Sequence, residues 1–162
     1  MRKKNIVLYT VIVFALAMVL IPLSIAKPNT RLNGDCFIQL QWDFVGFGGT
    51  NPYSFIGTVS GDIDGILKIA LLEAWFPAPG VEHFIEYWRI ETLTGTIEGE
   101  NKGKWTMSNF KWLANGEVTA ATGDWADLVG SKWQYGGTTD DPSVGPPNLV
   151  TGNGKFHITH NK

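Results

Sequence analysis

Residues 36–44 read Cys-Phe-Ile-Gln-Leu-Gln-Trp-Asp-Phe, and this stretch decides the fold class. Apolar residues occupy every even position, whereas Gln39, Gln41 and Asp43 occupy three of the odd ones. An alternation of period two over this length predicts a β-strand with one buried face. The residues that we expect to be buried together are Ile38, Leu40, Trp42 and Phe44.

Further stretches have the composition of strands and are separated by turn residues. They are residues 54–60, 66–76, 83–93, 104–113, 117–122, 131–135 and 155–160. Residues 66–76 could also form one face of a helix, but Gly65 before them and Pro77 after them favour a strand. We expect turns at residues 61–65 and 98–103, and a tight hairpin at the Asn-Gly pair at 115–116.

This succession of short strands, with no convincing helix, predicts an all-β domain that forms a single antiparallel barrel of about eight strands. The seven Trp, nine Phe and 19 Gly agree with it, because aromatic residues favour strands and glycines favour turns and bulges.

The N-terminus predicts export from the cytoplasm. Arg2, Lys3 and Lys4 form a basic cluster, and residues 6–26 carry no charge. That order is typical of a secretory signal, and the small residues Ser24 and Ala26 suit cleavage before residue 27. The apolar run is also long enough to span a bilayer, so residues 1–26 are either a signal peptide or a transmembrane anchor. Either way, residues 27–162 form the barrel domain outside the cytoplasm.

Composition excludes several classes of function. The net charge of −2 and the lack of a basic stripe argue against nucleic acid as a partner. Cys36 is the single cysteine, which rules out an internal disulfide and a cysteine-based zinc site. His157 and His160 are three residues apart and therefore lie on opposite faces of a strand. We expect no metal and no cofactor.

Two glycine-rich segments carry a family resemblance. Residues 95–105 read Gly-Thr-Ile-Glu-Gly-Glu-Asn-Lys-Gly-Lys-Trp, and residues 121–130 read Ala-Thr-Gly-Asp-Trp-Ala-Asp-Leu-Val-Gly. Together they resemble the allene-oxide-cyclase-like barrels, a group that includes the dirigent proteins, although Ala121 stands where those proteins have glycine. The resemblance implies an eight-stranded antiparallel barrel with a cavity, often oligomeric. Its members differ in activity, so the fold transfers no chemistry.

A candidate site follows from pairing residues 66–76 with residues 83–91 as a hairpin. The simplest register places Glu73 opposite Glu86 and Trp75 opposite Phe84, with Trp88 on the same face. Two carboxyl groups inside an apolar barrel would raise the pKa of at least one of them, as acid–base catalysis requires. The alternative is that this face looks outward, or that each glutamate meets a cation.

Glu91 is a secondary candidate, because similar barrel proteins often carry a glutamate four residues before the glycine that corresponds to Gly95. On the predicted strand it lies on the face opposite to Glu86, so a bulge would be needed to bring both into one cavity.

We expect an extracytoplasmic barrel that binds a small, largely apolar molecule in an aromatic cavity. The residues expected to bind it are Trp42, Trp75, Phe84, Trp88 and Glu91. One alternative is a cyclase- or isomerase-like enzyme that uses Glu73 and Glu86 as catalytic residues. The other is a structural barrel that is filled by its own side chains and forms homo-oligomers. A membrane is a further partner if the N-terminal segment is retained.

Overall fold

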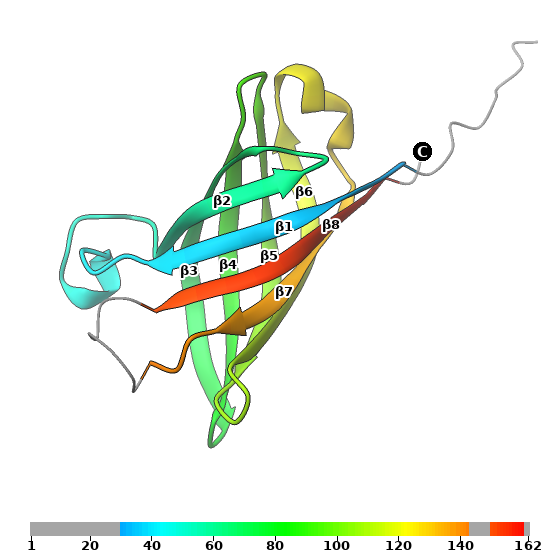
Figure 1. The fold of residues 1–162 in the computed structure, drawn as a ribbon. Coiled ribbons are helices and arrows are strands. Elements are labelled where there is room, and N and C mark those ends of the chain that lie inside the picture. Colours follow the sequence, from blue (N-terminus) through cyan, green and yellow to red (C-terminus); the bar gives the residue numbers. More distant parts are fainter. Residues whose placement is uncertain (1–29, 143–149, 161–162) are drawn as a thin grey trace, which may run out of the picture.

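The computed structural model describes residues 30–142 and 150–160, and these residues form a closed antiparallel barrel (Figure 1). Each strand pairs with the next along the chain, and the last strand pairs back with the first. The strands are β1 (Thr30–Leu40), β2 (Phe55–Gly61), β3 (Gly65–Ala78), β4 (Val81–Glu91), β5 (Thr96–Thr106), β6 (Lys111–Ala121), β7 (Lys132–Thr139) and β8 (Thr151–His160). The predicted all-β fold and eight-stranded antiparallel barrel are confirmed.

The described residues include two short 3-10 helices, η1 (Val45–Phe47) and η2 (Gly123–Leu128). Neither these nor any other helix in residues 30–142 and 150–160 has the length and apolar character needed to cross a membrane. The predicted signal or anchor at residues 1–26 lies outside the described residues.

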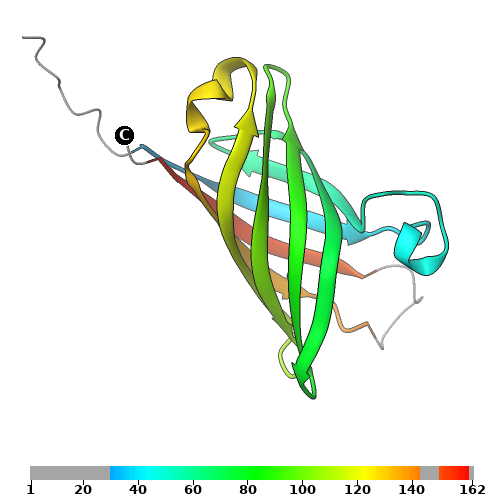
Figure 2. The same ribbon diagram turned by 180° about the vertical axis from the view of Figure 1, so that it is seen from behind.

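The barrel has two different ends (Figures 1 and 2). The first, which we call the termini end, carries Thr30 and His160, the β2–β3 and β4–β5 turns, and η2. The second, which we call the loop end, carries the β1–β2 loop with η1, and the β3–β4 and β5–β6 turns. Because β4 begins at the loop end and finishes at the termini end, position along β4 measures depth in the barrel.

Aromatic rings fill the half of the barrel near the termini end. The ring centroids of Trp88 and Trp133 are 4.3 Å apart, and those of Trp133 and Phe156 are 5.4 Å apart, with both pairs stacked. Inward-facing glycines make room for rings of this size. A Cβ atom at Gly99 would lie 2.7 Å from the Trp88 ring, closer than real Cβ contacts. The abundant glycines of this chain therefore serve the core as well as the turns.

Glycine also explains two wrong turn predictions. Residues 98–103 lie within β5, where Gly99 and Gly103 face inward, and residues 115–116 lie within β6. A Cβ atom at Gly116 would collide with the main-chain oxygen of Glu100 on the neighbouring strand, so glycine there permits close strand approach. The β5–β6 turn is at residues 107–110, inside the stretch that we predicted as a strand.

The first strand ends earlier than its alternation predicts. Ile38 is buried and Leu40 is half-buried, but Trp42 is 70% exposed. After Gln41 the main chain bonds to itself, since Asn51 donates to the Asp43 carbonyl at 2.9 Å. These local bonds replace the ladder with the neighbouring strands, and the predicted burial of Trp42 is wrong.

Candidate functional site

A β-bulge in the β3–β4 hairpin decides which carboxyl groups enter the barrel. Leu71 lies opposite Glu86, but the next pair is Glu73 with Ile85, so Leu72 is an extra residue. The shift by one residue turns Glu73 to the outer surface, where it is exposed. The predicted pairing of Glu73 with Glu86 is wrong, although the strand prediction for residues 66–76 is confirmed.

Glu86 itself lies inside the barrel and is 4% exposed. The Tyr135 hydroxyl on β7 donates a hydrogen bond of 2.6 Å to its Oε2 atom. Burial raises the pKa of the Glu86 carboxyl to about 7; the Tyr135 hydrogen bond opposes this rise, and the charge of Glu82 adds to it. Burial and the neighbouring Glu86 also raise the pKa of Tyr135 well above its ordinary value. Around neutral pH the Glu86 carboxyl can therefore either donate or accept a proton.

Asn101 on β5 completes a buried polar cluster with Glu86 and Tyr135. Its side-chain amide interacts with both neighbours and thereby lowers the pKa of Glu86 and that of Tyr135. Neither its Nδ2 nor its Oδ1 atom, however, makes a hydrogen bond of standard geometry with any described residue. The indole nitrogens of Trp88, Trp112 and Trp133 are also buried without such a partner. Buried polar groups are nearly always satisfied, so this interior offers hydrogen bonds to a small molecule or to water.

The second carboxyl group of the interior belongs to Glu82. It lies on the same face of β4 as Glu86, four residues closer to the loop end. Partial burial raises the pKa of Glu82, and its charge raises the pKa of Glu86. The interior thus contains a pair of interacting carboxyl groups, and its members are Glu82 and Glu86.

Exposure along β4 indicates which end gives access to this cluster. Ile90 and Trp88, near the termini end, are both 0% exposed, whereas Phe84 is 5% exposed and Glu82 is only half-buried. On β6, Ala114 is fully buried and Trp112, nearer the loop end, is 6% exposed. Contact with solvent therefore increases toward the loop end, where Glu82 is the most exposed of these inward-facing residues.

The predicted aromatic residues divide between the interior and the surface. Phe84 and Trp88 are buried inside the barrel as expected. Trp75 lies on the outer surface beyond the bulge, where its ring meets His83 edge-on with centroids 5.5 Å apart. Trp42 is exposed in the β1–β2 loop. Of the four aromatic residues that we predicted to bind a ligand, the interior therefore contains Phe84 and Trp88.

Glu91 lies on the outer wall, on the face opposite to Glu86. Its carboxylate forms ion pairs with Lys68 at 2.8 Å and with Arg89 at 3.2 Å. The hydrogen bond from Lys68 lowers the pKa of Glu91. No bulge brings it inside, so Glu91 belongs to a surface ion-pair network and not to the buried cluster.

The sequence analysis missed Glu82, Asn101 and Tyr135. Glu82 falls within the Pro/Gly stretch that we read as a loop, and Asn101 falls in the wrongly predicted turn. Tyr135 shares the parity of Trp133 in a predicted strand, which was the one available signal for its inward position. Pairing it with Glu86, 49 residues away, required the closed barrel.

Comparisons of this chain with protein-family models, with curated proteins and with solved structures found no match. The function therefore has to be argued from the barrel and its buried cluster.

Proposed function

We propose that this barrel is an extracytoplasmic binding protein for a small, largely apolar molecule that carries one hydrogen-bonding group. The observation that carries the proposal is the Glu86–Tyr135–Asn101 cluster, which is buried among aromatic rings and keeps unpartnered polar atoms. An eight-stranded barrel is just wide enough to be filled by side chains or to hold one small ligand. Here the aromatic stack fills one half, and solvent contact increases toward the other.

The bound molecule would enter from the loop end and place its polar group against the cluster. Phe84 and Trp112 supply apolar and aromatic surface beside the path. At the inner end of this path, the Asn101 amide offers a hydrogen-bond donor and an acceptor. The Glu86 carboxyl can act as a donor or as an acceptor near neutral pH. Such an arrangement fits a hydroxyl or carbonyl group on an apolar body.

Native mass spectrometry of the protein purified from its own host tests this proposal. We expect a small molecule to remain bound to the wild-type protein and to be lost from Asn101→Leu, which keeps the side-chain size but removes the amide. The matched control is Asn153→Leu, because Asn153 is exposed on the strand β8. A wild-type mass that corresponds to the chain alone would contradict the proposal.

The pKa of Glu86 favours a second function for the same site, namely proton transfer in a cyclase- or isomerase-like reaction. A carboxyl group with a pKa of about 7 can take a proton from one atom of a bound molecule and return it to another. The Glu86→Gln variant separates the two functions. An enzyme would lose turnover and still bind, whereas a binding protein would show no turnover before or after the substitution.

The location and the ancestry of the barrel are further parts of the proposal. The basic and then apolar N-terminus supports export, and the intact mass of the exported protein tests cleavage before residue 27. The closed eight-stranded topology supports a relationship to the allene-oxide-cyclase-like barrels. In the segments that carry the resemblance, Gly99 and Gly103 lie within β5, and Gly123 begins η2.

A further inference from the structure

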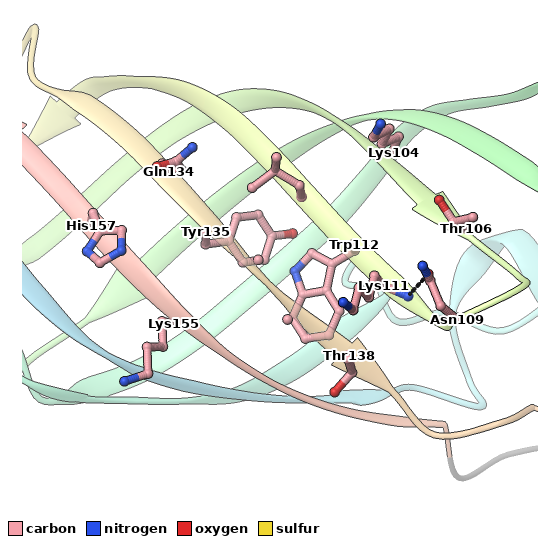
Figure 3. Close-up of a pocket in the computed structure, with 13 residues that line it drawn as sticks. Lys104, Thr106, Asn109, Lys111, Trp112, Gln134, Tyr135, Thr138, Lys155 and His157 are labelled. Carbon is pink, nitrogen blue, oxygen red and sulfur yellow. Dashed lines mark hydrogen bonds between the residues drawn. The ribbon is translucent and has the colours of Figure 1, made fainter.

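We propose that the outer wall of the barrel carries a second binding site, specific for phosphate groups, in a groove across β5 to β8. The groove has a volume of about 580 Å³, and its charged side chains belong to the outer face of the sheet, although Trp112 and Tyr135 also contribute to its lining. Its cationic residues are Lys104, Lys111 and Lys155, accompanied by His157 (Figure 3). No function proposed for the interior uses these residues.

The strand registers place the three lysines close together on the outer face of the sheet. Lys104 lies opposite Leu113, Leu113 opposite Gly136, and Gly136 opposite Lys155, so these four residues form one row across four strands. Lys111 is two residues from Leu113 on β6 and therefore points from the same face. Gly136 has no side chain and the neighbouring Leu113 side chain lies close to it, so no polar or charged side chain of this row stands between the two outer lysines.

Figure 3 shows this arrangement: Lys104 on β5 lies at one side of the groove, and Lys155 and His157 on β8 lie at the other. Neighbouring strands are about 4.8 Å apart, so the Cα atoms of Lys104 and Lys155 are about 14 Å apart along the row. Two extended lysine side chains can bridge most of that distance.

The described residues that line the groove contribute positive charge and no negative charge. None of the described residues that line it is Asp or Glu. Lys68 and Lys132 elsewhere on the barrel form ion pairs with glutamates at 2.8 and 2.9 Å, whereas Lys155 forms a longer ion pair, at 3.9 Å, with Asp35 on β1. Three lysines in one groove are a local excess of positive charge in a chain with more acidic than basic residues, 15 against 13.

The donors in the groove favour phosphate. Lysine acts as a compact point charge and binds phosphate without the fork geometry that suits arginine to carboxylate. Thr106 and Thr138 add hydroxyl groups, and Gln134 adds an amide. A smaller groove of about 270 Å³ shares Gln134 and His157 and brings in Arg31, so a ligand with a second phosphate group can extend into it.

The test uses pyrophosphate and the full-length protein, with binding measured by calorimetry and by the amide resonance of Gly136. We expect pyrophosphate to bind more tightly than inorganic phosphate, and more weakly as ionic strength rises. The double variant Lys104→Gln, Lys111→Gln should weaken binding by about tenfold. The control is Lys102→Gln, which removes one positive charge from β5 outside the groove and should weaken binding by no more than about twofold.

Vesicles distinguish the two sources of phosphate. Binding to phosphatidylglycerol vesicles in excess of phosphatidylcholine vesicles, lost in the double variant, assigns a lipid headgroup. Pyrophosphate binding without that difference assigns a soluble phosphate compound. Failure of wild-type protein to bind either probe, or equal weakening by Lys102→Gln, overturns the proposal. Glu86→Gln should leave pyrophosphate binding unchanged, so failure of this site and failure of the interior site are separable.

Discussion

Replacing Glu86 with Gln should remove a specific part of the pH dependence of stability. The pKa of Glu86 rises from 4.5 to about 7 on folding, so between these values the native state binds more protons than the unfolded state. Stability therefore falls as the pH rises through this interval. The full effect, present above both pKa values, corresponds to about 3 kcal/mol. Gln carries no titrating proton, and its side-chain oxygen can still accept the Tyr135 hydrogen bond.

The assay is urea unfolding, followed by tryptophan fluorescence, at about pH 4 and about pH 8. The stability of Glu86→Gln relative to wild type should increase by about 3 kcal/mol between the two pH values. Titrating groups that do not interact with Glu86, such as Glu91 on the outer wall, cancel in this difference. Glu73→Gln is the control, because its side chain is on the outer surface, and it should behave as wild type. The reasoning would be refuted if the difference in unfolding free energy between wild type and Glu86→Gln changed by less than about 0.5 kcal/mol between the two pH values.

Three further predictions concern packing and reactivity. Gly103→Ala should destabilise the barrel by about 3 kcal/mol, because the new methyl group would overlap the Phe84 ring. Gly130→Ala should cost about 1 kcal/mol, because the site has open space but the backbone has a φ of 83°. Chemical unfolding of both variants checks these values. Leu67→Ala removes a fully buried side chain and should lower the free energy of unfolding by about 2–5 kcal/mol. Trp42→Ala, in the exposed loop, should change it by less than about 0.5 kcal/mol. Equal losses of stability in the two variants would contradict the burial pattern. Burial raises the pKa of Cys36 to about 12, so its thiol should react with a thiol reagent only after unfolding, and rapid labelling of the native protein would contradict its burial.

The alternation in residues 36–44 and the succession of turn-bounded strands were enough to predict the fold class. Period two is a local property, since successive side chains of any strand point to opposite faces. It correctly indicated that Ile38 is buried, and that Glu86 and Glu91 lie on opposite faces of one strand. It could not show where a strand ends, because the alternation continues through Trp42, although the backbone no longer pairs with a neighbouring strand there.

The composition of the candidate site depended on the tertiary structure. A single extra residue, Leu72, turned Glu73 outward, and no local pattern marks a bulge in a run of apolar residues. The sequence context of Gly99 indicates a turn, yet Gly99 lies in a paired strand, where its lack of a side chain leaves room for the Trp88 ring. Asn101 is the register partner of Glu86 on the adjacent strand β5, whereas Tyr135 on β7 reaches Glu86 across the closed barrel. The sequence thus determined which faces the strands have, and long-range packing determined which residues meet.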